Sequence, residues 1–204
     1  MKKCPDLRKK LGLGQINISL PTFNLKTMLN IEDLYNLYTP GCICTFTGLK
    51  MDVFNPKPEM ICIEDIAHAL SQIPRFGGHL PRFYSVAQHA FECSLIADPE
   101  DAFEALMHDG SEAYLLDMPA PIKQKMPEYQ KIEHQLMQVI AKRFNFTYPK
   151  SLAVGKIDKQ ILEMEWRKIM LKEPLSNGFP FVTLTPATAK EMFLCRFEEL
   201  KPKN

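Results

Sequence analysis

Residues 85–114 read SVAQHAFECSLIADPEDAFEALMHDGSEAY, and this segment decides the fold. Apolar residues recur at helical spacing on both sides of its central Asp-Pro pair. Asp98 is suited to cap a helix, and Pro99 is suited to the first helical position. The segment therefore predicts two helices joined by a tight turn, which would bring His89 close to His108.

The second of these helices carries three groups that could bind an ion. Neighbouring residues in a helix point about 100° apart, so His108 and Asp109 can approach one ion from the same edge. Glu112 lies one turn further along that edge. A single His-Asp pair is more often a core histidine beside a surface charge. Here several ionisable groups interrupt apolar helices, and buried charges are costly unless they are paired or bound to metal. We therefore expect a metal site.

The composition indicates one globular domain. The chain has 204 residues, with 25 Lys and Arg against 24 Asp and Glu, so its formal net charge is +1. This balance gives no excess of positive charge of the kind that attracts nucleic acid, and we do not expect a nucleic-acid partner. The six cysteines form no CxxC pair, which excludes a zinc ribbon or a redox dithiol of that spacing.

No segment approaches the roughly 18 apolar residues that a membrane span needs. Residues 1–10 carry five basic groups, but no apolar signal core follows them. From this pattern we expect a cytoplasmic protein without a membrane partner.

The hydrophobic pattern predicts a mainly all-α fold, a single helical bundle with a small hairpin or irregular segment near its N-terminal end. We expect an N-terminal extension over 1–36, a core over 37–172, and a loop and helix over 173–204. That last helix could pack on the core or form an interface. The helices are expected at 61–73, at 127–144, at about 149–171 and at 185–200.

The order of motifs resembles the HD-domain metal-dependent phosphohydrolases, and within them the bacterial and phage 5′-deoxynucleotidase group. The motifs are Arg75-Phe76, then YSVAQH ending at His89, then HDGSEAYLLDMPAPIK over 108–123. The likeness covers residues 37–172. A lone His-Asp pair is a weak signal, but this ordered set is specific.

The resemblance implies a role for each matching residue. Glu112 matches the acid that orients or deprotonates the attacking water, and Asp117 matches a second acid near the leaving group or a further metal. The ion would be divalent, and these ligand types do not select among Mn, Co, Ni, Fe, Zn and Mg. The four implied metal ligands are His89, His108, Asp109 and Asp158.

The same resemblance implies a set of substrate contacts. Arg75 matches an arginine that contacts phosphate or sugar, and Lys123 could add positive charge at the same mouth. Phe76 could stack on the sugar or base, although core packing would account for it equally well. The group often has tryptophan at this position to select deoxyribose, so Phe76 weakens any prediction of 2′-deoxy selectivity. His79 could line the pocket or merely cap a turn.

We expect a 5′-deoxynucleotidase that releases phosphate from deoxynucleoside monophosphates. The alternative within the same family is a triphosphohydrolase that releases triphosphate from deoxynucleoside triphosphates. A non-catalytic module that senses nucleotides is a third reading, and a nucleic-acid-binding protein would rest on the N-terminal lysines alone. The resemblance also allows a homo-oligomer.

Overall fold

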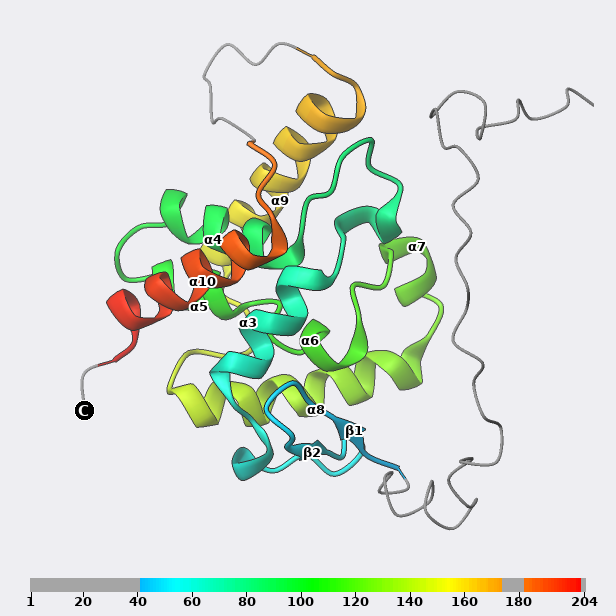
Figure 1. The fold of residues 1–204 in the computed structure, drawn as a ribbon, viewed down its shortest axis with the longest axis vertical. Coiled ribbons are helices and arrows are strands. Elements are labelled where there is room, and N and C mark those ends of the chain that lie inside the picture. The colour runs from blue at the N-terminus through cyan, green and yellow to red at the C-terminus, as the bar shows by residue number, and fades with distance from the viewer. Residues whose placement is uncertain (1–40, 174–181, 203–204) are drawn as a thin grey trace, which may run out of the picture. The chain divides into compact units, whose positions relative to one another are not determined.

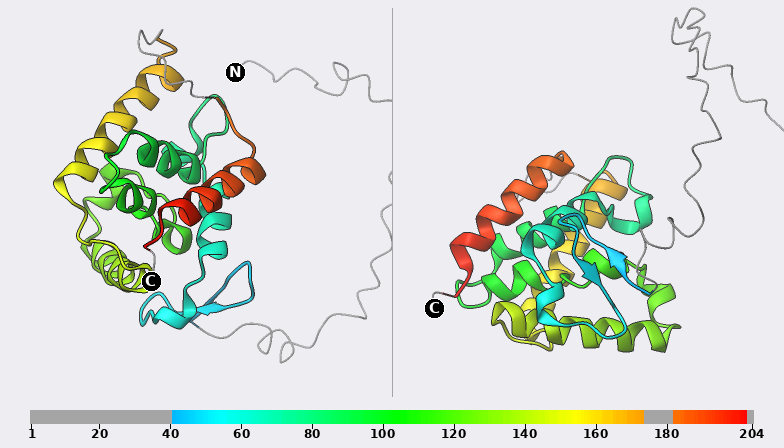
Figure 2. Two further views of the ribbon diagram at one scale, coloured as in Figure 1. Left: turned by 90° about the vertical axis from the view of Figure 1, so that its left-hand side faces the viewer. Right: turned by 60° about the horizontal axis from the view of Figure 1, so that its bottom comes forward.

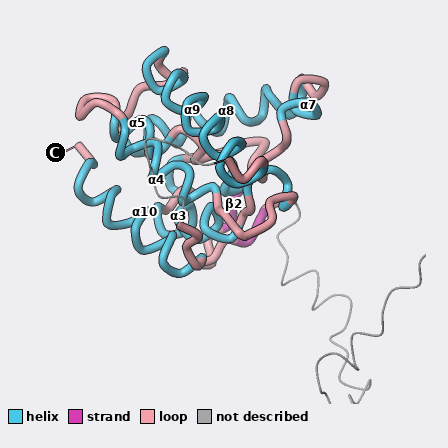
Figure 3. Tube along the Cα trace, turned by 90° about the horizontal axis from the view of Figure 1, so that it is seen from above, coloured by secondary structure: helices cyan, strands magenta, loops and turns pink. Residues whose placement is uncertain are grey.

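The computed structural model describes residues 41–173 and 182–202 (Figure 1). Most of this part is helical, and its strands form one small hairpin (Figure 3). The expected mainly all-α fold class is thereby confirmed. The expected extension over 1–36 lies outside the described residues.

The helices fall close to the predicted segments. Their bounds are α3 Ile63–Gln72, α4 Val86–Ile96, α5 Ala102–Met107, α6 Glu112–Leu115, α7 Ala120–Lys123, α8 Pro127–Phe144, α9 Leu152–Glu165 and α10 Pro186–Leu200. Three shorter turns accompany them, the 3-10 turns η2 Pro58–Met60 and η3 Arg75–Gly78 and the π-helical turn η4 Trp166–Met170. Side-chain caps define several starts, because hydroxyl oxygens accept the free backbone N–H groups of the first turn. Ser85, Ser151 and Thr185 cap α4, α9 and α10 in this way.

The hairpin joins β1 (Ile43–Cys44) to β2 (Lys50–Met51) in antiparallel register. Gly48 lies in the connecting turn at φ +87°, a backbone conformation that favours glycine. The turn is held to α3 by Asp65, whose carboxylate accepts hydrogen bonds from the backbone N and the hydroxyl of Thr47 at 2.7 and 2.8 Å. The hairpin is therefore fastened to the helical core.

The predicted helix after Asp98-Pro99 begins later and ends earlier than expected. The backbone N of Asp101 donates to the carbonyl of Asp98, so residues 98–101 form a turn and α5 starts at Ala102. The helix ends at Met107, and turns over 108–111 lead into α6. A Cβ at Gly110 would lie 3.1 Å from the Met107 carbonyl oxygen and 3.4 Å from the Ile140 side chain. Glycine permits this close approach to α8 where the helix is interrupted.

Helix α4 lies at the centre of the bundle. It packs against α3, α5, α9 and α10, and Figure 2 (left) shows α4 and α5 in green between α9 in yellow and α10 in red. Phe193 and Phe197 of α10 are buried in the core that α3 and α4 share. These two aromatic residues therefore close the chain's own core.

None of the helices within 41–173 and 182–202 combines the length and the apolar character that crossing a membrane would require.

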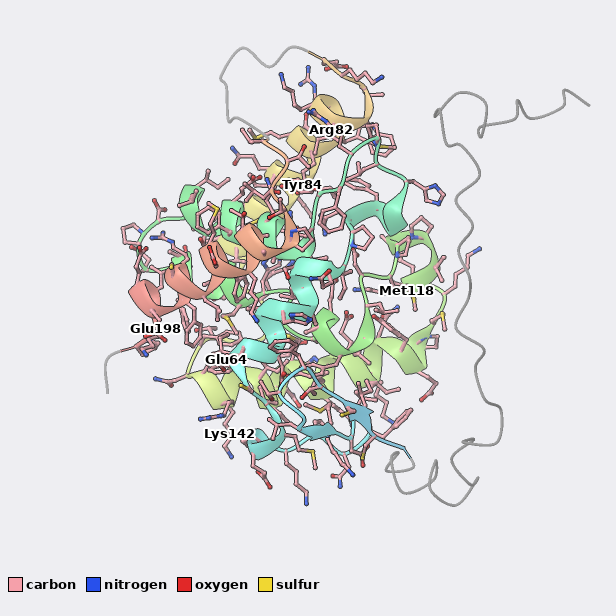
Figure 4. The ribbon with its side chains drawn as sticks, in the orientation of Figure 1. Glu64, Arg82, Tyr84, Met118, Lys142 and Glu198 are labelled. Atoms are coloured by element: carbon pink, nitrogen blue, oxygen red, sulfur yellow. The ribbon has the colours of Figure 1, made fainter. Side chains whose placement is uncertain are left out.

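A buried polar network ties α4 to the segment before α10. The side-chain amide of Gln88 donates to the Val182 carbonyl at 2.7 Å and to Glu92 at 2.9 Å. The hydroxyl of Tyr84, labelled in Figure 4, donates to the other Glu92 oxygen at 2.6 Å. Burial raises the pKa of Glu92 to about 7, although both hydrogen bonds oppose the shift. The folded protein thus holds a proton on this carboxyl more tightly than the unfolded chain does.

This proton predicts the pH dependence of one variant. Because the folded-state pKa of Glu92 is raised, its contribution to stability is full below about pH 4.5 and is lost as pH rises through 7. Glu92→Gln keeps the side chain neutral, accepts from Gln88 and can donate to the hydroxyl oxygen of Tyr84. The difference in free energy of unfolding between the variant and the wild type should shift by about 2–3 kcal/mol in favour of the variant between pH 4.5 and pH 8. Urea unfolding at both pH values measures this, and an equal difference at the two values would contradict it.

Candidate metal centre

Four side chains from three helical segments converge on one point beside α4. His89 comes from α4, His108 and Asp109 follow the end of α5, and Asp158 comes from α9. The Nε2 of His89 lies 3.3 Å from Asp158 Oδ1 and 3.7 Å from Asp109 Oδ2. The Nε2 of His108 lies 3.2 Å from Asp109 Oδ2 and 3.7 Å from Asp158 Oδ1. The structure thus brings together all four residues that were expected to bind metal.

The other nitrogen of each imidazole is already engaged. The Nδ1 of His89 lies 2.6 Å from a Glu165 oxygen, and the Nδ1 of His108 lies 2.7 Å from the Ala105 carbonyl oxygen. Because those oxygens accept, each Nδ1 carries the hydrogen and each Nε2 of a neutral ring keeps a lone pair. Within the described residues, the buried Nε2 of His108 has no hydrogen-bond partner. Both lone pairs therefore face the same point, as metal ligands do.

The charges around this point favour a cation. Burial opposes protonation of His108, yet Asp109 raises its pKa to about 10. Burial would raise the pKa of Asp158, but the imidazoles of His108 and His89 beside its Oδ1 hold it well below its usual range. The centre thus attracts positive charge, which protons on the imidazoles or a metal ion can supply. His89, Cys93 and His108 also offer ligand atoms within 4.8 Å of one another, and this cluster could hold a metal ion.

Glu165 is a buried carboxylate that sequence reasoning missed. It accepts from His89 Nδ1 and lies 3.2 Å from Arg75 Nη2, and its side chain has no exposed surface. Burial would raise the pKa of Glu165, but His89 and Arg75 lower it. One carboxylate therefore orients both a candidate metal ligand and the candidate phosphate-binding arginine. Its position seven residues after Asp158, two helical turns along the same face, was the signal that could have revealed it.

A cavity of about 700 Å³ opens beside the metal centre. Of the site residues predicted from the sequence, it is lined by Arg75, Phe76, Asp109, Glu112, Asp117, Lys123 and Asp158. His79 is exposed at the end of η3 and is not among the lining residues. Met118, labelled in Figure 4, marks the loop between α6 and α7 that forms part of the rim.

Glu112 lies in the cavity wall beside Lys123, whose Nζ is 3.5 Å from Glu112 Oε1. Burial raises the pKa of Glu112 well above its usual value, and the negative charges of Asp109 and Asp117 raise it further. Its other oxygen, Oε2, is buried and has no hydrogen-bond partner within the described residues. A carboxyl group in this state can accept or hold a proton beside the metal centre.

Among the cavity residues that were not predicted as site residues, three are basic or aromatic. Trp166 follows Asp158 by eight residues, and its ring lies 5.9 Å from that of Phe76 at an interplanar angle of 43°. Lys150 pairs with Asp158 Oδ2 at 2.5 Å, on the oxygen that does not face the histidines. Lys159 lines the same wall. Trp166 is far from Phe76 along the chain, and the π-helical turn after α9 brings it to the cavity.

The convergence of ligands predicts stabilisation by divalent metal. Mn²⁺ or Co²⁺ added to metal-stripped protein at 100 times its Kd should raise Tm by about 5–10 °C, because only the folded state holds the ligands together. His108→Gln should remove this shift. His134→Gln is the matched control, since His134 lies exposed on α8 and pairs with the Tyr148 hydroxyl. Differential scanning calorimetry measures the effect, and a full metal shift in His108→Gln would contradict it.

Comparison with known proteins identifies relatives of this chain. No family model matches it. The Escherichia coli K12 protein YfdR is 40% identical over 168 residues, which covers 78% of this chain and 94% of YfdR. A Rhodobacter capsulatus protein is 33% identical over 108 residues, covering 48% of this chain and 55% of that protein. Both relatives are described as uncharacterized. With this identity over nearly the whole of YfdR, the chain belongs to the YfdR family.

Proposed function

We propose that this protein is a metal-dependent phosphohydrolase of the HD type, which cleaves deoxynucleoside monophosphates to nucleoside and phosphate. One observation carries the proposal. The Nε2 atoms of His89 and His108 converge with two carboxylates beside a cavity of about 700 Å³, and Arg75 lies at the same wall. A cavity of that size suits a small-molecule ligand.

The charges of the cavity fit an anionic substrate once a metal is present. The lining holds four basic and five acidic side chains, so one divalent ion would change its formal charge from −1 to +1. Such an ion would lower the pKa of a bound water and withdraw charge from phosphoryl oxygens. His89, His108, Asp109 and Asp158 would hold it.

The other residues would bind and orient the substrate. Arg75 Nη1 lies 3.7 and 4.0 Å from Asp117 and Asp109, distances too long for hydrogen bonds, so its N–H donors can serve a phosphate oxygen. The planar guanidinium of Arg75 is suited to binding phosphate, and its Nη2 donates a hydrogen bond to Glu165 that holds it in place. Glu112 would accept a proton from the attacking water, and Lys123 beside it favours the charged form of this carboxylate.

The pairing of two of the three cavity lysines favours monophosphates over triphosphates. Lys123 is bonded to Glu133 at 2.7 Å and Lys150 to Asp158 at 2.5 Å. These two cations are therefore already matched by carboxylates and offer little charge to a longer phosphate tail. The triphosphohydrolase alternative would need such a cationic surface.

Phosphate release by metal-stripped protein, with Mn, Co, Mg or Zn added back, tests the proposal on deoxynucleotides and ribonucleotides. Orthophosphate from monophosphates is expected, and Glu112→Gln should lower kcat by about 10²–10⁴-fold through loss of proton transfer. Glu128→Gln, an exposed glutamate in the first turn of α8, is the control and should keep full activity.

Two other outcomes would replace this proposal. Triphosphate released from deoxynucleoside triphosphates would establish the triphosphohydrolase alternative. Nucleotide binding without hydrolysis under every metal would establish a sensing module.

The aromatic pair at the cavity provides a surface for a nucleobase. Trp166 is 46% exposed, and Phe76 is held at φ +56° in a turn rich in glycine. Aromatic stacking on a base contributes about 1–3 kcal/mol. Trp166→Ala should therefore raise KM for deoxynucleoside monophosphates about 5- to 100-fold with little change in kcat.

The substrate deoxyribose 5-phosphate, which lacks a base, separates stacking from general damage to the site. Its kinetics should be the same in Trp166→Ala and in the wild type. Leu152→Ala is the control variant, because Leu152 is 88% exposed at the start of α9, the helix that leads into η4. Trp166 is the only tryptophan in the chain, so nucleotide binding should also quench the intrinsic fluorescence. An unchanged KM for nucleotides in Trp166→Ala would contradict the stacking role.

A further inference from the structure

A buried thiol lies beside the metal centre. Cys93 follows His89 by four residues on α4, so both side chains leave the same face of the helix. Its sulfur is 3.6 Å from His89 Nε2, the nitrogen that carries the lone pair, and the residue has no exposed surface. The sulfur therefore lies beside the same nitrogen that Asp109 and Asp158 approach.

A second observation indicates that a ligand belongs at this point. The Nε2 of His108 is buried and has no hydrogen-bond partner within the described residues, while its Nδ1 is fixed by the Ala105 carbonyl. The ligand atoms of His89, Cys93 and His108 all lie within 4.8 Å of one another. An ion that satisfies this unpartnered nitrogen would also come within reach of the Cys93 sulfur.

The spacing is that of atoms sharing one ion. Zinc binds thiolate sulfur at about 2.3 Å and imidazole nitrogen at about 2.0–2.1 Å. At angles between about 90° and 110°, which cover six to four ligands, these lengths separate sulfur from nitrogen by about 3.1–3.6 Å. The same angles bring nitrogen and carboxylate oxygen to about 2.9–3.4 Å, which overlaps the range of 3.2–3.7 Å between the histidines and the two aspartates.

We propose that Cys93 is a sulfur ligand of the metal centre, so that nitrogen, oxygen and sulfur together hold the ion. The inference rests on the metal-dependent function proposed above and extends it to metal selection. On binding, the S–H bond breaks, the proton leaves to solvent, and the thiolate donates to the ion without any redox change. A thiolate favours Co, Fe, Ni or Zn over Mg or Mn, which prefer oxygen ligands.

Cobalt spectroscopy tests the assignment directly. Co²⁺ titrated into the metal-stripped protein, with a phosphine reductant, should give visible d–d bands and a near-ultraviolet sulfur-to-cobalt charge-transfer band. Cys93→Ala and Cys93→Ser should lose the charge-transfer band and keep the d–d bands. Cys195→Ala is the matched control, because Cys195 is exposed on α10, and it should keep both.

Metal affinity gives a second readout. Competition titrations should show that Cys93→Ala weakens Co²⁺ and Zn²⁺ binding about 10- to 100-fold and leaves Mn²⁺ binding nearly unchanged. If the variant does not fold, the wild-type spectrum decides, since a cobalt-loaded wild type without the charge-transfer band overturns the inference. Wild-type protein that binds no Co²⁺, and so shows no d–d bands, would overturn the metal-dependent function as well. Wild-type protein that shows d–d bands without the charge-transfer band would overturn the role of Cys93 alone.

Discussion

Two imidazoles with their Nδ1 atoms engaged face two carboxylates across a few ångströms, and the rest of the molecule maintains that convergence. Lone pairs and negative charges brought together in a buried place repel one another unless a cation lies among them. Helix α4 supplies one imidazole from the centre of the bundle, and its packing against α5 and α9 fixes where the other ligands arrive. The bundle can thus be understood as a frame that holds these groups in place.

Glu165 connects the candidate metal centre to the cavity wall. It is bound on one side by His89 and on the other by Arg75, so the orientation of a candidate metal ligand and that of the candidate phosphate-binding arginine depend on one carboxylate. A carboxylate behind a ligating histidine fixes the tautomer and raises the basicity of the ring. Because the carboxylate is fully buried between two donors, movement of either partner would leave charge unpaired in the protein interior. This arrangement connects the candidate metal centre and the wall of the cavity within one layer of side chains.

Local sequence signals located much of the fold because the relevant interactions are local. Pro127 and the Thr185-Pro186 pair mark the starts of α8 and α10, and Gly48 marks the turn of the hairpin. The start of α5 was misplaced by three residues because Asp98 and Pro99 suit a turn as well as a helix start. The interruption after Met107 was missed, and Gly110 there approaches Ile140 on α8, a contact with a residue distant in sequence that no local pattern reveals.

The order of histidines and acids along the chain was enough to predict which four candidate ligands converge, because ligand chemistry limits the residue types and helical periodicity limits their spacing. Residues whose role depends on side chains from other helices could not be found in that way. The roles of Glu165, Lys150 and Cys93 depend on the side chains that they contact. His79, which looked equally suitable in the sequence, lies outside the cavity lining. Packing between α4, α5 and α9 decides these contacts, because it brings together side chains that are too far apart in the chain for helical periodicity to relate them.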